Sequence, residues 1–364
     1  MAGPNPWTGF ADPGLVADLM SRLRHGLAAG GGVEIGATPK DEIWRDGKVS
    51  LCRYRREEEA NRDEPPLLVV HGLIGRQTIS DLEPGRSLVQ RLLGFGADIF
   101  VLDWGSPGPE DRCKDFTDYA EDHLGDALAE IRKAAGRPKA AILGICQGGV
   151  FALCHAARHP GRVAGVIAAI TPVDFHADKD LPPPENGLLN HWIRNLPETL
   201  LTDLIDDRGM LAGQLTGALF QQLKPARTLA KYTYGLASMA ADKAAMETFL
   251  RMETWLADRP DMPGAAAKEW LIALYQQNRL VEGKFKIAGR PVDLGAIACP
   301  VLNIFGSHDH IVPPACSRAL GRYLAPSLYT ELEVPTGHVG VFVSRQSQQI
   351  VAPAIADWLG AITP

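Results

Sequence analysis

The sequence predicts an α/β fold with a mostly parallel sheet and helices on both of its faces. Six short apolar runs bounded by turn signals are typical of buried strands: 65–73, 96–104, 139–146, 163–173, 300–306 and 328–334. Helical patterns such as "SLVQRLLGFG" and "FTDYAEDHLGDALAEIRKAAG" lie between most of them. Strands that alternate with helices favour parallel pairing, because a helix carries the chain back across the sheet.

The alternation stops after residue 175. Residues 176–289 contain helical patterns and no convincing strand, and the chain then returns to the strand-like run at 300–306. Segments such as "LLNHWIRNLP" and "EWLIALYQQNRL" are amphipathic or largely apolar, so they need a surface to cover. We interpret 176–289 as a mainly helical cap inserted into a core of 38–175 and 290–364, with 1–37 as an amino-terminal extension. The alternative is a second domain with its own core.

Composition excludes several classes of function. The 364 residues are 46% hydrophobic and 22% charged, which is ordinary for a soluble globular protein. A net charge of −6 without a dense basic run gives no reason to expect a nucleic-acid partner. The sequence shows no signal peptide and no apolar stretch long enough for a membrane span, so we expect a cytoplasmic protein. Its scattered cysteines include no C-x-x-C pair and predict neither a metal site nor disulfides.

The string "GICQGG" at 144–149 carries the first chemical signal. It follows an apolar run and precedes a helical pattern, as in the strand, sharp turn and helix of a nucleophile elbow. A free cysteine is usually a small buried hydrophobe, and we assign Cys154, Cys299 and Cys316 to the core for that reason. A packing cysteine needs no flanking glycines, however, and the N-terminus of a helix favours a thiolate. Cys146 is therefore the predicted nucleophile.

An acid and a histidine follow two later predicted strands. Asp309 comes after 300–306, and His338 comes after 328–334. The order of nucleophile, acid and histidine is that of α/β-hydrolase triads, whose members gather at the carboxyl ends of strands. His308 and His310 alternate with Asp309 along the chain, so we expect their side chains to point elsewhere.

The string "HGLIG" at 71–75 predicts an oxyanion hole. A His-Gly pair after the first core strand is where this kind of fold turns its backbone toward the substrate. We expect the backbone N–H groups of Leu73 and Gln147 to hold the developing oxyanion. In this interpretation His71 itself has only a structural role.

These residues resemble the poly(3-hydroxyalkanoate) synthases, specifically the catalytic subunits (PhaC type) of the two-component class III enzymes. The similarity covers nearly the whole chain and includes "PPLLVVHGLIGRQTISDLEPGRSLVQRLL", "GICQGG", "LYQQNRL", "VDLGAIACPVLNIFGSHDHIVPP" and "YTELEVPTGHVGVFVS". The resemblance implies that Cys146 carries the acyl group, that His338 is its general base, and that Asp309 is the third catalytic residue.

The resemblance also implies substrates and partners. It implies polymerisation of (R)-3-hydroxyacyl-CoA, with 3-hydroxybutyryl-CoA as the expected substrate, into polyhydroxyalkanoate at the surface of the polyester granule. Coenzyme A is released and no cofactor is expected. The resemblance also implies a homodimer that associates through the cap. A second, non-catalytic subunit (PhaE type) is expected because the matching subfamily works with one, and because the recognisable core begins near residue 38 and leaves little upstream chain for the extra domain of single-component synthases.

The sequence departs from the family in two places and leaves two other functions open. Such synthases commonly read Ala-Leu-Val-Asn-Arg where this chain has Gly72 to Arg76, and Thr336 stands where a second glycine often precedes the Gly-His pair. The first departure is closer to an ordinary hydrolase, so a cysteine-dependent thioesterase or polyester depolymerase is the alternative enzyme. A catalytically idle granule-binding protein is the alternative outside enzymes, and the presence of all three triad residues argues against it.

Overall fold

The protein is built around one eight-stranded sheet. The structure, a computed structural model, describes residues 33–56, 64–183, 185–223 and 242–362. The strands lie in the order β1-β2-β4-β3-β5-β6-β11-β12, and every neighbouring pair from β4 to β12 is parallel. They are β1 (Lys40–Asp46), β2 (Val49–Tyr54), β3 (Leu67–Val70), β4 (Ile99–Asp103), β5 (Ala141–Ile145), β6 (Gly165–Ala169), β11 (Val301–Gly306) and β12 (Tyr329–Val334). The predicted mostly parallel α/β sheet is confirmed.

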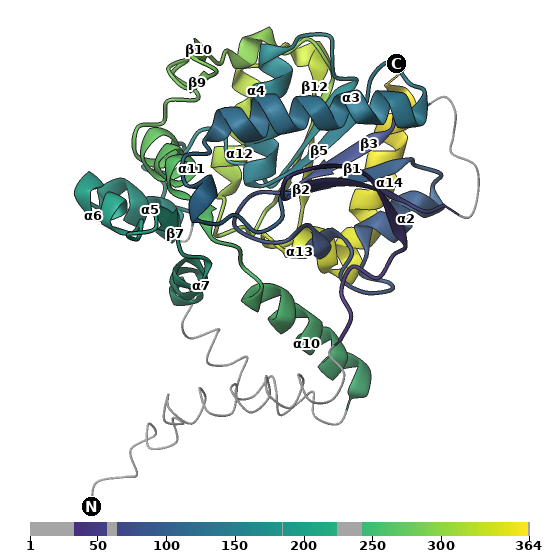
Figure 1. The fold of residues 1–364 in the computed structure, drawn as a ribbon, viewed down its shortest axis with the longest axis horizontal. Coiled ribbons are helices and arrows are strands. Elements are labelled where there is room, and N and C mark those ends of the chain that lie inside the picture. The colour runs from purple at the N-terminus through teal and green to yellow at the C-terminus, as the bar shows by residue number, and fades with distance from the viewer. Residues whose placement is uncertain (1–32, 57–63, 184, 224–241, 363–364) are drawn as a thin grey trace, which may run out of the picture.

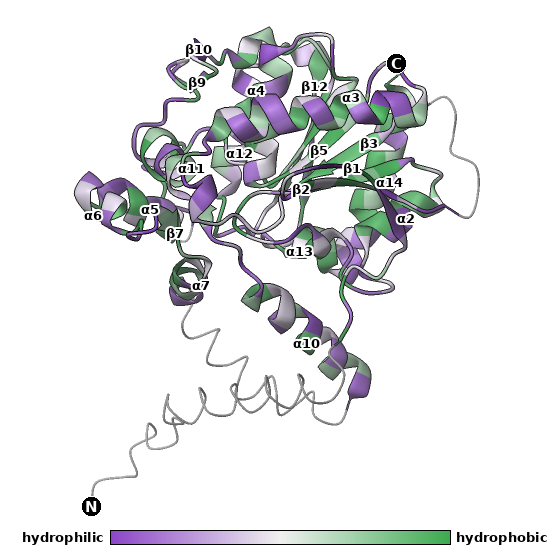
Figure 2. Ribbon diagram, viewed as in Figure 1, coloured by the Kyte–Doolittle hydropathy of each residue, from purple (hydrophilic) through white to green (hydrophobic). Residues whose placement is uncertain are grey.

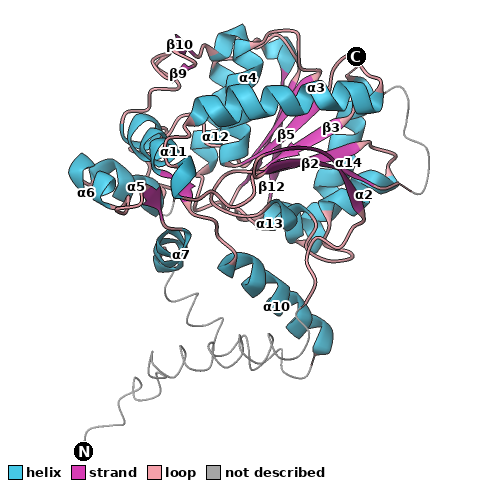
Figure 3. Cartoon of the chain, viewed as in Figure 1, coloured by secondary structure: helices cyan, strands magenta, loops and turns pink. Residues whose placement is uncertain are grey.

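Helices cover both faces of this sheet (Figures 1 and 3). On β3, Leu68 and Val70 belong to the core under α3 (Leu124–Ala135) and α4 (Gln147–Arg158), whereas Leu67 and Val69 belong to the core under α2 (Leu88–Gly94), α13 (Gly340–Val343) and α14 (Arg345–Ala361). Successive residues of a strand point to opposite faces, so a strand buried on both faces must be apolar at every position. Figure 2 shows this as largely hydrophobic strands beneath helices with mixed faces.

Strands β1 and β2 form an antiparallel hairpin at one edge of the sheet, and the sequence did not predict it. Gly47 takes a φ of +55° in the turn between the strands, and β2 pairs with β4 in the antiparallel sense. Asp-Gly between two extended segments is a strong hairpin signal. The strand pattern is weak in β1 because this edge strand carries charged, exposed residues along much of its length.

The segment between β6 and β11 contributes no strand to the eight-stranded sheet within the described residues. Its longer helices are α5 (Leu188–Asn195), α6 (Glu198–Asp203), α7 (Gly213–Gln222) and α10 (Lys243–Ala257), followed by α11 (Gly264–Lys268) and the π-helix η5 (Glu269–Gln276). The expectation of no strand in 176–289 is wrong in detail, because β7 (Met210–Leu211) pairs with β8 (Met262–Pro263), and β9 (Lys286–Ile287) pairs with β10 (Arg290–Pro291). Two-residue strands are too short to show an alternating pattern.

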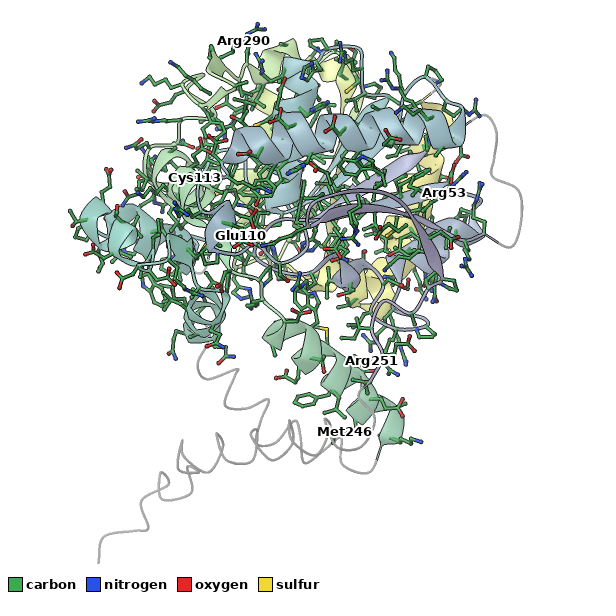
Figure 4. The ribbon with its side chains drawn as sticks, viewed as in Figure 1. Arg53, Glu110, Cys113, Met246, Arg251 and Arg290 are labelled. Atoms are coloured by element: carbon green, nitrogen blue, oxygen red, sulfur yellow. The ribbon has the colours of Figure 1, made fainter. Side chains whose placement is uncertain are left out.

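Helix α10 is bonded to the core through its middle and its C-terminal end. Arg251, which Figure 4 labels on this helix, donates to Glu83 Oε2 at 2.8 Å. Further along, Trp255 Nε1 donates to the carbonyl oxygen of Arg76 at 2.9 Å, and the Arg76 guanidinium bonds Asp258 at 3.0 Å. Residues 1–32 of the expected extension and 224–241 of the expected cap lie outside the described residues. No helix in the described part is long and apolar enough to cross a membrane.

Candidate active site

Cys146 lies at a strained turn between β5 and α4. Its φ of +54° and ψ of −118° lie outside the regions that side chains other than glycine usually adopt. The surrounding glycines are needed because the backbone segments touch. A Cβ on Gly144 would lie 2.5 Å from Gly149 Cα, and one on Gly148 would lie 2.3 Å from the oxygen of Val70. The glycine frame in the sequence is therefore a consequence of the elbow geometry.

Asp309 and His338 are hydrogen-bonded to each other at the ends of β11 and β12. Oδ2 of Asp309 lies 2.7 Å from Nδ1 of His338. The other carboxylate oxygen accepts the backbone N–H groups of Ile311 at 2.9 Å and Val312 at 3.0 Å. Because Asp309 is also buried, with 5% of its surface exposed, its carboxylate has a fixed orientation. It holds the imidazole with Nε2 directed away from the acid.

The histidine also lies close to the sulfur, since His338 and Cys146 line the same cavity and Cys146 contributes to the pKa of the imidazole. Burial lowers the pKa of His338, but the charges and hydrogen bonds of Asp309 and Cys146 outweigh burial and raise it to about 10. A histidine that keeps its proton at this position can donate that proton to a leaving group in the cavity. The structure thus brings the three predicted triad residues together.

Three other cysteines are buried in surroundings that disfavour an ionised thiol. Cys154, Cys299 and Cys316 are all buried, as predicted for core residues, and all six cysteines are free. Burial raises the pKa of the Cys299 thiol to about 11, and it raises the pKa values of Cys154 and Cys316 as well. A thiol that resists ionisation is a poor nucleophile. Of the six cysteines, all of which lie in the described part of the chain, only Cys146 lines the cavity that His338 also lines.

Two members of the triad line a cavity of about 250 Å³. Cys146 and His338 lie in its wall together with apolar residues from both sides of the sheet edge and from α7 and α10. The apolar lining residues are Ile74, Ile79, Ile145, Ile170, Phe220, Trp255, Leu256, Ile311, Val339 and Phe342. An apolar cavity with a few converging polar groups is typical of a site for an acyl substrate.

His71 lies in the wall of the same cavity, which the sequence analysis did not foresee. Burial lowers the pKa of its imidazole to about 4, so the ring is neutral at physiological pH. Its backbone carbonyl accepts Trp104 Nε1 at 2.6 Å, which fixes the backbone here, and the purely structural role expected for His71 stays a prediction. His308 is exposed and lies outside the cavity lining, as predicted.

The expected oxyanion donors are arranged differently from the prediction. The N–H of Leu73 donates to Oε1 of Gln147 at 2.7 Å, and Leu73 is not among the residues that line the catalytic cavity. The Leu73 N–H, which we expected to bind the oxyanion, is therefore bonded to the Gln147 side chain in this structure. The role of the Leu73 N–H stays a prediction, since the Gln147 amide has to move before a substrate oxygen can accept that bond.

The fold and the Cys-His-Asp arrangement define an α/β-hydrolase-type protein with a cysteine in place of the usual serine. The alpha/beta hydrolase fold family matches residues 65–344, so the chain belongs to that family. The poly(3-hydroxyalkanoate) polymerase subunit PhaC of Allochromatium vinosum is 37% identical over 328 residues, which cover 90% of each chain. That of Thiocystis violacea is 34% identical over 94% of each chain. The chain is therefore a member of the PhaC subunit family of poly(3-hydroxyalkanoate) polymerases.

Solved structures agree on the fold. The putative non-heme bromoperoxidase BpoC from Mycobacterium tuberculosis has a TM-score of 0.51 at 18% identity, over 89% of this chain and 100% of that chain. A thermophilic esterase from Thermogutta terrifontis has a TM-score of 0.50 at 18% identity, over 90% of this chain and 100% of that chain. At these identities the likeness supports the shared architecture and not a shared activity.

Proposed function

We propose that the protein polymerises (R)-3-hydroxyacyl groups delivered as CoA thioesters, through a covalent thioester on Cys146 and with release of CoA. The observation that carries this proposal is the placement of Cys146 and His338 in the wall of one apolar cavity, with His338 hydrogen-bonded to Asp309. Membership of the PhaC family supports the reaction class, because its curated members are named polymerases. The expected acyl group is 3-hydroxybutyryl.

The first step exchanges one thioester for another. Cys146 Sγ attacks the carbonyl carbon of the substrate, and the tetrahedral intermediate collapses as the carbon–sulfur bond to CoA breaks. The proton held by His338 passes to the leaving CoA sulfur. The backbone N–H of Gln147 stabilises the oxyanion at the N-terminus of α4, and that of Leu73 joins it after the Gln147 side chain moves. The acyl group stays activated, which a serine ester would not achieve.

The second step forms the ester bond. His338, now neutral, accepts the proton of a 3-hydroxyl group, and that oxygen attacks the Cys146 thioester. The new carbon–oxygen bond forms as the carbon–sulfur bond breaks, and His338 keeps the proton beside the released sulfur, which restores the starting state. Because Asp309 Oδ2 bonds Nδ1 of the imidazole, we assign Asp309 to orienting His338 rather than to contacting the hydroxyl. These steps are redox-neutral transfers between thiols and alcohols, so we expect them to need no cofactor or metal.

We propose that residues 176–289 act as the cap over this chemistry. Phe220 of α7 and Trp255 of α10 contribute to the cavity wall, and α10 is hydrogen-bonded to the core through Glu83 and Arg76. Water has to be kept from the acyl-enzyme if esters are to accumulate, because hydrolysis would release the free acid. Closing the apolar wall over Cys146 serves that purpose, and its opening admits the substrate.

One experiment tests the proposed reaction. Purified protein is incubated with 3-hydroxybutyryl-CoA while free CoA thiol, soluble 3-hydroxybutyrate and insoluble polyester are measured separately. CoA release together with polyester is the expected result. CoA release together with free acid would instead identify a thioesterase, and the absence of CoA release would contradict any enzymatic role. A Cys146→Ala sample gives the background for all three measurements.

We further propose a homodimer, a second non-catalytic subunit of the PhaE type, and action at the polyester granule surface. Large apolar side chains are exposed on three helices of the proposed cap: Leu188 and Trp192 on α5, Leu200 on α6 and Leu219 on α7. Exposed apolar groups of this size favour association. Sedimentation should show a dimer, and a lag before CoA release should shorten when the second subunit is added. Lag-free activity of a monomer, unaffected by that subunit, would contradict both interactions.

A further inference from the structure

A guanidinium group lies in the wall of the catalytic cavity. Arg259 follows the end of α10 and lines the same cavity as Cys146. Its Nε donates to the carbonyl oxygen of Leu256 at 3.1 Å, and its guanidinium carbon lies 5.1 Å from the centre of the Phe220 ring. These contacts position the stem of the side chain and leave its two terminal nitrogens without a bond among the described residues.

The acidic residues beside Arg259 are bonded to other groups. Asp258 bonds Arg76 at 3.0 Å. Asp261 accepts the N–H of Gly213 at 2.9 Å and lies 3.2 Å from Arg208. Within the described part of the chain, no carboxylate forms an ion pair with Arg259. A partly buried cation without a counter-charge is unfavourable, and burial accordingly lowers the pKa of this guanidinium.

Helix α7 makes room for this arrangement. A Cβ on Gly217 would lie 3.1 Å from Arg259 Cδ, and a Cβ on Gly213 would lie 2.3 Å from the carbonyl oxygen of Arg259. Glycines four residues apart share one face of a helix, so α7 presents its least bulky face to the arginine. The side chain therefore reaches the cavity through a gap that larger residues would close.

We propose that Arg259 is a phosphate-binding subsite for the CoA portion of the substrate. This inference rests on the proposed function. The acyl group, its 3-hydroxyl and the growing polyester carry no charge, so they offer nothing for an uncompensated cation to bind. The anionic groups of the substrate are the diphosphate and the 3′-phosphate of CoA. Arginine binds such oxygens through paired N–H groups, and an enclosed cation does so more strongly than an exposed one.

The site also distinguishes the two products of acyl transfer. Once the acyl group has passed to Cys146, the CoA thiol keeps its phosphates and its contact with Arg259, whereas the acyl-enzyme keeps none. Arg259 would bind each substrate only through its CoA portion. The same cavity can therefore accept one CoA thioester after another while the uncharged polyester chain stays attached to Cys146. Arg259 is thus a substrate-binding residue that makes no contact with the reacting atoms.

The test compares two thioesters of the same 3-hydroxybutyryl group, one with CoA and one with pantetheine, which has no phosphate. The ratio of their kcat/KM values is measured for the unaltered protein, for Arg259→Met and for Arg259→Lys. The CoA-to-pantetheine ratio of kcat/KM should fall about 10–100-fold in Arg259→Met, because that variant loses a charge-assisted hydrogen bond to the phosphate. It should fall by less in Arg259→Lys, which keeps the positive charge. Arg290→Met is the matched control, because Arg290, which Figure 4 labels, is exposed on β10 and does not line the cavity. Its ratio should not change.

A third thioester, with 3′-dephospho-CoA, distinguishes the two phosphate sources. A smaller effect of Arg259→Met on this thioester than on the CoA thioester would assign the contact to the 3′-phosphate, and an equal effect would assign it to the diphosphate. An unchanged CoA-to-pantetheine ratio in Arg259→Met would overturn the inference, since the arginine would then only shape the cavity. Calorimetric titration with free CoA decides the same question if no thioester is turned over, which would itself be the failure of the proposed function.

Discussion

The amide oxygen of Gln147 accepts the N–H of Leu73 at 2.7 Å, so two segments predicted to hold the substrate oxyanion are bonded to each other. Nε2 of the same amide is buried without a hydrogen-bond partner among the described residues. Gly72 permits this contact, because a Cβ there would lie 2.8 Å from Gln147 Cβ. The Gln147 side chain thus satisfies the Leu73 donor until a substrate oxygen replaces it.

This relationship predicts opposite effects for two substitutions of Gln147. Gln147→Met removes the competing acceptor, so single-turnover acylation of Cys146 should be at least as fast as in the unaltered protein. Gln147→Glu keeps an acceptor on Leu73 and adds a negative charge beside the developing oxyanion, so acylation should slow by tenfold or more. Rapid-quench measurement of the acyl-enzyme gives both rates. A loss of about 100-fold in both variants would show instead that the Gln147 amide is itself an oxyanion donor.

Two cysteine substitutions separate the nucleophile from the core. Cys146→Ala should stay folded and lose turnover, because the acyl carrier is gone. Cys154→Ala should retain turnover and lower the free energy of unfolding, because it leaves a gap in a fully buried position. Mass spectrometry after a brief exposure to substrate should find the acyl group on the peptide with Cys146. Acylation of another cysteine in a folded Cys146→Ala protein would refute the assignment.

The charge state of His338 predicts a pH dependence. Its folded-state pKa of about 10 lies above the usual value of about 6.5 for an unfolded histidine. The folded protein therefore binds the proton more tightly, and this stabilisation is fully present below about pH 6.5 and is lost as the pH rises through about 10. Asp309→Asn removes a principal cause of the raised pKa.

The comparison of Asp309→Asn with the unaltered protein tests this linkage. The difference in unfolding free energy between the two should be largest near pH 6.5 and should shrink toward pH 10, by about 1.4 kcal/mol for each unit of pKa that Asp309 contributes. The imidazole proton resonances of His338 should titrate at lower pH in the variant. Asp206→Asn, on the surface near Arg208, is a control that should leave the His338 titration unchanged. An unaltered titration in Asp309→Asn would contradict the role given to the acid.

The triad could be predicted from the sequence because each member directly follows a strand. Cys146, Asp309 and His338 come after β5, β11 and β12, and parallel strands place such residues at one edge of a sheet. The direction of the Leu73 N–H could not be predicted in the same way. A peptide unit can turn its donor toward the cavity or toward a neighbouring side chain, and the difference depends on the position of the Gln147 amide, which no motif encodes.

The residues that form the cavity wall could not be predicted from the sequence either. Trp255 and Arg259 reach the site from a segment that lies more than 100 residues from Cys146 in the sequence and contains no recognisable catalytic motif. Their position depends on how α10 packs against the core. The contact of Trp255 with Gly75 is an example, because a Cβ on Gly75 would approach the indole ring to 3.2 Å. The glycine that departs from the family pattern therefore makes room for a cap side chain.

Helix α10 should respond to the loss of one buried carboxylate. Glu83 accepts Arg251 at 2.8 Å and Thr248 Oγ1 at 2.7 Å, and its side chain is only 9% exposed. Glu83→Gln removes the charge that Arg251 faces, so α10 should detach from the core more often. Hydrogen exchange of the amides of 243–257 should become faster, while exchange in β5 and β6 stays slow.

The same variant tests whether the cap controls access to Cys146. If α10 closes the cavity, Glu83→Gln should alkylate faster at Cys146 with a bulky maleimide and should release more free acid per CoA, because water reaches the acyl-enzyme. Lys243→Gln is the matched control, since its ion pair with Glu247 is exposed, with its atoms 3.9 Å apart, and contributes little to stability. Faster exchange in α10 without any change in alkylation or acid release would show that this helix packs against the core without gating the site.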